Sequence, residues 1–102
     1  MPAERTFRLS PLAEADLEDI WSYTADRWSI EQAEHYHGML LKVLGQLAEG
    51  SSTGRHVDVR RGYLKYRVGS HVIFFRSHDV GIDVVRILHQ RMDVSLHLVD
   101  DT

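Results

Sequence analysis

Three short apolar runs occupy the second half of the chain and predict an antiparallel meander. They span Leu64–Val68, His71–Ser77 and Ile82–His89. Only Gly69-Ser70 separates the first two runs, and a turn containing Asp79 and Gly81 separates the last two. Linkers this short leave room only for hairpins, so the three strands are expected to follow one another in a single sheet.

The first half of the chain has helical spacing, preceded by an alternating run at Thr6–Leu9 that predicts a short strand. Ser10 and Pro11 suit the N-cap and first turn of a helix. The apolar positions of this helix recur every three or four residues, at Ala13, Leu17, Ile20, Trp21, Thr24 and Trp28. Ser29 can cap a second helix over residues 30–49, whose apolar stripe comprises Ala33, Tyr36, His37, Leu40, Leu41, Leu44, Leu47 and Ala48.

Glycines interrupt and terminate this second helix. Gly38 and Gly45 lie inside it, at a cost of about 1 kcal/mol each relative to alanine, and either weaken the helix or allow a neighbouring backbone to approach. The segment 50–54, rich in glycine and serine, ends the helix, and the connection from there to Gly62 is expected to be irregular.

These elements predict one α+β domain over residues 1–102: an N-terminal strand, a helical hairpin, a three-stranded antiparallel meander (β-α-α-β-β-β) and a short C-terminal helix. A chain of 102 residues supports one compact core and no second module. Two helices can cover one face of such a sheet, which leaves the other face available for function.

The two-residue loop at Gly69-Ser70 places Val68 opposite His71 and so fixes which side chains share a face. Leu64, Tyr66, Val68, Ile73 and Phe75 form the face for the helices to cover. The open face collects Tyr63, Lys65, Arg67, Val72, Phe74 and Arg76, and if the last strand buries Val85 and Ile87, then Val84, Arg86 and Leu88 join it. Cations around an apolar floor indicate a docking surface, although arginines that only solubilise a surface would account for the charges alone.

Composition narrows the function classes. The chain has no cysteine and no long apolar run, which favours a reducing cytoplasm and gives no sign of membrane insertion. No clustered histidine or carboxylate spacing suggests a metal, and no glycine-rich phosphate loop or nucleophile motif suggests a cofactor or covalent catalysis. A net charge of −3 is unusual for a protein that binds nucleic acid directly.

Several linked segments resemble one family. They are the helix start Ser10–Leu17, the triplet Asp19-Ile20-Trp21, the strand Gly69–Arg76 and the ending Arg86–Asp93. Together they resemble the ParE branch of the ParE/RelE superfamily, the toxins of bacterial type II toxin–antitoxin pairs, over about residues 5–98. The resemblance implies a cytoplasmic toxin that inhibits DNA gyrase through a contact with its GyrA-type subunit, touches DNA only indirectly and has no catalytic residues, metal or cofactor.

The resemblance also implies two binding surfaces. A ParD-like antitoxin would form a hetero-oligomer with the toxin by covering the open face, at Lys65, Arg67, Val72, Phe74, Arg76, Val84, Arg86 and Leu88. The target would be bound by residues at and beyond the end of the last strand, namely His89, Arg91, Met92, Leu96 and Leu98.

Two alternatives remain at this point. RelE-like relatives cleave messenger RNA on the ribosome, for which Arg67, Arg76, Arg86, His89 and Arg91 would be the candidate catalytic set. Such cleavage needs an acid and a base besides cations, and the tyrosine near the C-terminus of many ribonuclease members has no counterpart here. The second alternative is a nontoxic protein-interaction module.

Overall fold

The computed structural model describes residues 5–57 and 61–92. Its elements are β1 (Thr6–Leu9), α1 (Pro11–Arg27), α2 (Ile30–Glu49), β2 (Arg55–His56), β3 (Leu64–Val68), β4 (His71–His78) and β5 (Gly81–His89). The predicted helices and meander are confirmed, with strand ends shifted by one residue at β4 and β5. The short strand β2 was not predicted, because two residues carry no alternation signal. The expected C-terminal helix lies outside the described residues.

Both helices begin and end where the capping residues place them. The Ser10 side chain accepts from the Ala13 amide at the start of α1, and the Ser29 side chain accepts from the Gln32 amide at the start of α2. Gly50 ends α2 in the left-handed conformation with φ of 88°. A Cβ added at Gly38 or Gly45 would meet nothing within 4 Å, so these glycines weaken α2 without admitting a neighbouring backbone.

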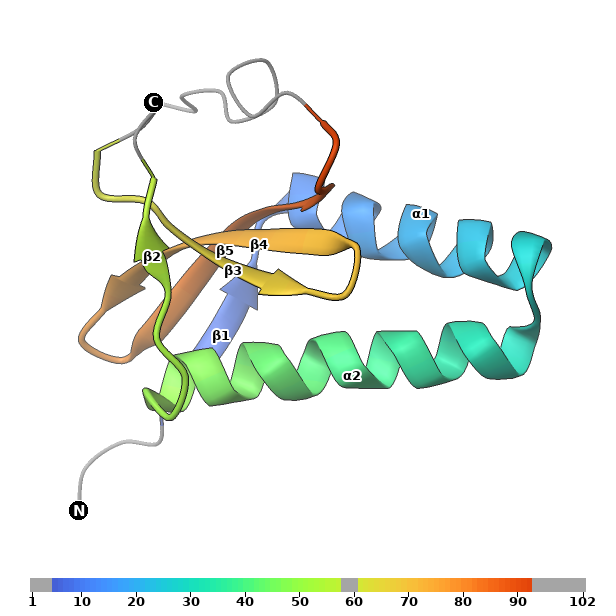
Figure 1. Ribbon diagram of the computed structural model, residues 1–102. Coiled ribbons are helices and arrows are strands. Elements are labelled where there is room, and N and C mark those ends of the chain that lie inside the picture. The colour runs from blue at the N-terminus through green and yellow to red at the C-terminus, as the bar shows by residue number, and fades with distance from the viewer. Residues whose placement is uncertain (1–4, 58–60, 93–102) are drawn as a thin grey trace.

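The strands form one mixed sheet in the order β1-β5-β4-β3-β2, with both helices packed on the same face (Figure 1). The β3–β4 register confirms the predicted pairing, from Leu64 opposite Phe75 to Val68 opposite His71. β1 pairs with β5 in parallel. This contact is very close at Gly81, where an added Cβ would lie 1.7 Å from the Thr6 carbonyl oxygen.

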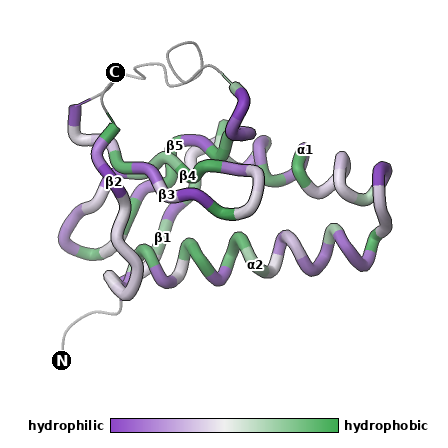
Figure 2. Tube along the Cα trace, in the orientation of Figure 1, coloured by the Kyte–Doolittle hydropathy of each residue, from purple (hydrophilic) through white to green (hydrophobic). Residues whose placement is uncertain are grey.

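The main core lies between the helices and the sheet. Its buried members come from α1, α2, β3, β4 and β5, and they include Leu17, Leu40, Leu44, Ile73 and Phe75. Hydrophobic positions recur along both helices between hydrophilic ones (Figure 2), as an amphipathic hairpin on a sheet requires. Two residues of the predicted stripes are exposed to solvent: Leu41, and Trp28, which is 70% exposed because α1 ends before it.

Arg5 ties the start of the chain to the ends of two other elements. Its guanidinium donates to the carbonyl oxygens of Ala48 (2.7 Å), Asp79 (2.8 Å) and His78 (3.2 Å). The first of these belongs to the last turn of α2, whose carbonyl groups have no partner within the helix. One side chain therefore fixes β1, α2 and the β4–β5 turn together.

Candidate functional site

The sheet face opposite the helices carries exposed cations, but its apolar floor is covered. Lys65, Arg67 and Arg76 are exposed, as predicted. Phe74 and Leu88, predicted to form an open floor, are each only 1% exposed. The prediction that these two side chains lie at the surface is therefore wrong.

The cover comes from one residue that follows β2, Val57, and one that precedes β3, Tyr63. The Val57 amide donates to the Tyr63 carbonyl at 3.0 Å, and both side chains pack with Phe74 and Leu88 in a second apolar cluster. Val72 and Val85 lie partly buried at its edge. No periodic signal in the sequence indicated this cover, because its residues lie in an irregular connection.

A β-bulge overturns the predicted position of Val84. Phe74 pairs with Arg86, whereas the next residue, Phe75, pairs with Val84, so Val85 is the extra residue in β5. Val84 consequently faces the helices and is buried in the main core. Successive side chains alternate between the two faces of the sheet on each side of a bulge but not across it. The prediction assumed uninterrupted alternation along β5 and therefore assigned Val84 to the wrong face.

Arg86 is held by α1. The Asp16 carboxylate accepts from Arg86 Nε and Nη2, each at 2.8 Å, and from the Ile87 amide at 2.9 Å. The two side chains are 17% and 12% exposed. The Asp16 carboxylate thus provides an acceptor for the Ile87 amide, at a part of β5 that β1 does not reach. It also binds the Arg86 guanidinium, which was predicted to bind an antitoxin.

The helix–strand junction is fixed further by Ser10. Its amide donates to the Val84 carbonyl (2.9 Å), and its hydroxyl donates to the Val85 carbonyl (2.7 Å) while accepting from Ala13. The N-cap of α1 is thereby attached to the bulge in β5. The sequence indicated the cap but not its second role, which depends on the parallel pairing of β1 and β5.

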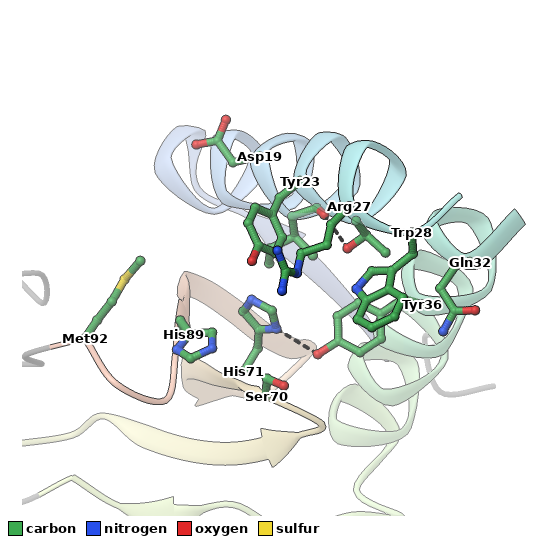
Figure 3. A pocket seen from close by; sticks show the side chains of 12 residues that line it. Asp19, Tyr23, Arg27, Trp28, Gln32, Tyr36, Ser70, His71, His89 and Met92 are labelled. Atoms are coloured by element: carbon green, nitrogen blue, oxygen red, sulfur yellow. Dashed lines mark hydrogen bonds between the residues drawn. The ribbon is translucent and has the colours of Figure 1, made fainter. Parts of the chain in front are cut away.

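A second site lies where the closed end of the helical hairpin meets the ends of β4 and β5 (Figure 3). We call it the hairpin pocket. It has a volume of about 720 Å³, and its lining residues are Asp19, Ile20, Tyr23, Thr24, Arg27, Trp28, Gln32, Tyr36, Ser70, His71, His89 and Met92. Of these, only His89 and Met92 were predicted as site residues.

Tyr36, His71 and His89 form the inner wall of the hairpin pocket (Figure 3). The Tyr36 hydroxyl lies 3.1 Å from the Val68 carbonyl and 2.7 Å from His71 Nδ1. A carbonyl oxygen can only accept, so both contacts are satisfied together when the single Tyr36 proton goes to Val68 and His71 carries its proton on Nδ1 and donates it to Tyr36. Neutral His71 then keeps its lone pair on Nε2, which points away from Tyr36 toward the side of the pocket formed by α1 (Figure 3).

The electrostatics of this wall favour the neutral form of His71. Burial lowers the pKa of His71, and the facing His89 lowers it further, against a smaller raising effect of Asp16. The two imidazole rings meet edge to face with centroids 5.4 Å apart. Burial also raises the pKa of Tyr36, against a smaller lowering by a hydrogen bond with the Ser70 backbone, so the hydroxyl stays protonated.

The turn between β3 and β4 must be glycine at its first position. Gly69 has φ of +56°, and an added Cβ would lie 2.8 Å from the Tyr36 hydroxyl. The turn therefore packs directly against α2, which brings Ser70 and His71 into the pocket wall. The Gly69-Ser70 pattern predicted the turn but carried no sign of this contact.

Three of the predicted target-binding residues belong to the described part of the chain, namely His89, Arg91 and Met92. The Arg91 amide donates to His89 Nδ1 at 3.2 Å and the Met92 amide donates to the His89 carbonyl at 2.9 Å, in a turn that follows β5. Met92 is 45% exposed. Leu96 and Leu98 lie outside the described residues.

The candidate ribonuclease set is spread over the sheet. Arg76 lies opposite Asp83 and His71 lies opposite His89, so five residues of β4 separate the two positions, roughly 17 Å at about 3.3 Å per residue. Arg76 lies over the Tyr63 ring, Arg67 donates to the Gly69 carbonyl, and Arg86 binds Asp16. The candidate ribonuclease residues are therefore not gathered around one point of the sheet.

Neither a metal cluster nor a membrane span occurs in the described part of the chain. Within residues 5–57 and 61–92, no group of three or more histidine, aspartate or glutamate side chains has a metal-binding arrangement. None of the helices in those same ranges combines the length and apolar character needed to cross a bilayer.

A separate groove of about 880 Å³ follows the two helices and includes Glu14, Glu18 and Glu34 beside Trp21 and Leu41. It is acidic, in contrast to the sheet face that carries Lys65, Arg67 and Arg76. No predicted site residue lines it.

Comparison with known proteins identifies the family to which this chain belongs. A sequence model of the family described as "ParE toxin of type II toxin-antitoxin system, parDE" matches residues 7–94. The chain belongs to this family.

Individual relatives agree with that assignment. The chain is 48% identical over 94 residues to Toxin ParE1 of Mycobacterium tuberculosis, covering 90% of this chain and 96% of the relative. It is 40% identical over 95 residues to Toxin ParE1 of Caulobacter vibrioides, covering 92% and 98%. A solved structure described as the chromosomal ParDE TA system from P. aeruginosa has the same fold, with a TM-score of 0.72, 18% identity and coverage of 83% and 95%.

Proposed function

We propose that this ParE-family toxin acts in the cytoplasm by binding and inhibiting DNA gyrase, and that a ParD-like antitoxin neutralises it. The observation that carries the proposal is the family match over residues 7–94 of the 102-residue chain. Inhibition by binding requires no catalytic residues, metal or cofactor. DNA contact is then indirect, through gyrase.

The antitoxin is proposed to dock on the cationic sheet face, which comprises Lys65, Arg67, Arg76 and the half-buried Val72. Three exposed cations on two neighbouring strands attract an acidic segment and align it along the strands. This surface excludes Arg86, which binds Asp16, and Val84, which is buried in the main core. The buried side chains of Phe74 and Leu88 lie beneath it in the second apolar cluster.

The docking surface has a direct test. Arg67→Glu should weaken antitoxin binding at least tenfold, because it replaces an exposed cation with a like charge for an acidic partner. Lys42→Glu, an exposed charge reversal on α2, is the matched control and should leave affinity unchanged. Equal affinity of both variants and the wild type would exclude this face. Phe74→Asp is unsuitable, because a carboxylate at a 1%-exposed position would unfold the domain.

The target has a separate test in cells. Induction of the toxin without its antitoxin should cause a DNA-damage response and filamentation while protein synthesis continues at first. The physical reason is that a poisoned gyrase holds cleaved DNA. Immediate loss of translation without DNA damage would instead indicate RNA cleavage and contradict the proposal.

A further inference from the structure

We propose that the hairpin pocket is the surface that engages gyrase, by receiving an apolar or aromatic side chain of the target with a carboxylate beside it. This inference rests on the proposed function and adds the location and chemistry of the contact. It also makes residues of the helical hairpin the principal contacts with the target, although the sequence predicted none of them as a site residue.

The rim of the hairpin pocket exposes side chains that a folded protein ordinarily covers. Trp28 is 70% exposed, Tyr23 is 64% exposed and Met92 is 45% exposed. All three line one concave surface of about 720 Å³ (Figure 3). Tryptophan and tyrosine dominate the binding energy of protein interfaces, and methionine adapts its shape to a partner.

The position of Trp28 follows from the way α1 ends. Trp28 is the C-cap residue, with φ of −121° and ψ of −82°, and its amide donates to the Thr24 carbonyl. The side chain therefore leaves the stripe that packs on the core and lies over the pocket, with the Arg27 guanidinium 6.0 Å from its ring centroid. The two groups therefore lie side by side in the lining, where one partner can contact both.

Polar groups define the chemistry of the partner. Arg27 supplies a permanent cation beside Trp28, which favours a carboxylate of the partner at that point, whereas the Asp19 carboxylate in the same lining disfavours one near itself. His71, held neutral and oriented by Tyr36, offers the Nε2 lone pair as an acceptor for an N–H or O–H donor. The apolar surface between them comes from Ile20 and the aromatic rings. An apolar side chain flanked by a carboxylate and a hydrogen-bond donor satisfies all of these groups.

Continuity with the predicted target-binding residues favours gyrase over the antitoxin as the occupant. His89 and Met92, at the end of β5, line the hairpin pocket. The cationic sheet face lies on the opposite side of the sheet, because Arg67 and Val72 alternate with the core residues Val68 and Ile73. The two partners would thus bind different faces of the domain.

The experiment measures two activities of the same purified variants: inhibition of gyrase supercoiling, and affinity for the cognate antitoxin. Trp28→Ala and Arg27→Glu should each raise the half-inhibitory concentration against gyrase at least tenfold and change antitoxin affinity less than twofold. Ile30→Ala removes a 64%-exposed apolar side chain next to the pocket, and Lys42→Glu reverses a charge elsewhere on the hairpin. Both controls should inhibit as the wild type does. Thermal melting checks that every variant is folded.

The outcomes are distinguishable. A wild-type toxin that leaves gyrase unaffected overturns the proposed function and this inference with it. A wild type that inhibits, together with Trp28→Ala and Arg27→Glu that inhibit equally well, overturns this inference alone. Variants that keep inhibition but lose antitoxin affinity assign the hairpin pocket to the antitoxin and also overturn it.

Discussion

Replacing Asp16 by alanine should be among the most damaging single changes at any polar position of this domain. The Asp16 carboxylate accepts three hydrogen bonds, two from Arg86 and one from the Ile87 amide, and it is 12% exposed. The substitution removes this carboxylate from the Arg86 guanidinium and leaves the Ile87 amide without its acceptor. It would also release α1 from the edge of β5.

The magnitude follows from the burial of the pair. Breaking a buried ion pair by removing one partner costs about 3–5 kcal/mol, and the remaining exposure of both groups reduces this to about 2–4 kcal/mol. For a domain of this size, such a loss lowers Tm by about 10–20 °C. Replacing both partners, by Asp16→Leu with Arg86→Met, should recover part of the loss, because an apolar pair avoids a desolvated charge.

Urea denaturation followed by circular dichroism measures the effect. Asp16→Ala should lower the transition midpoint at an unchanged slope, whereas Asp26→Ala, an exposed carboxylate on the same helix, should change stability by less than about 0.5 kcal/mol. An Asp16→Ala variant as stable as Asp26→Ala would refute the interpretation of Asp16 as the link between α1 and β5.

Three further predictions concern stability. Gly81→Ala should prevent the β1–β5 pairing, because the new Cβ would lie 1.7 Å from the Thr6 carbonyl oxygen; loss of amide protection in β1 would show it, and native protection would contradict it. Gly45→Ala should stabilise the domain by about 0.5–1 kcal/mol in urea denaturation, since nothing obstructs the methyl group, and a decrease would contradict this. Burial lowers the pKa of His71 in the folded protein, so the unfolded chain binds a proton at His71 more readily than the folded one does. The contribution of neutral His71 to stability is therefore complete above about pH 6.5, the ordinary pKa of histidine, and is lost as the pH falls from there through the folded pKa. Urea midpoints at several pH values should fall less steeply in His71→Gln, and identical profiles would contradict the assignment.

Local patterns were sufficient for most of the fold. Apolar periodicity located both helices, and the two-residue loop at Gly69-Ser70 fixed the β3–β4 register residue by residue. Capping by Ser10 and Ser29 located the helix starts. These features depend on neighbours along the chain, which a sequence displays directly.

The site was harder to predict because it depends on contacts between distant segments. The bulge at Val85 reassigned Val84 to the core, and Asp16 engaged Arg86 from 70 residues away. The covering of Phe74 by Val57 required the irregular connection after α2 to fold back over the sheet. Two-residue alternation cannot detect a bulge, and a charge count cannot pair an acid on a helix with a base on a strand.

The exposure of Trp28 could have been predicted from its position directly before Ser29, but the helical spacing of the α1 stripe favoured a buried position. Its spacing continued the apolar stripe of α1, which favoured the core, yet it directly precedes the N-cap Ser29 of the next helix. A residue in so short a connection between two helices cannot keep helical geometry with either of them. Its exposure, and with it the hairpin pocket, follows from that position.

The most direct test of gyrase inhibition is a supercoiling reaction with purified gyrase, relaxed plasmid and the purified toxin. We expect loss of supercoiling together with accumulation of linear DNA, and reversal of both effects when the cognate antitoxin is added. Full supercoiling at an excess of folded toxin over gyrase would contradict the proposed function.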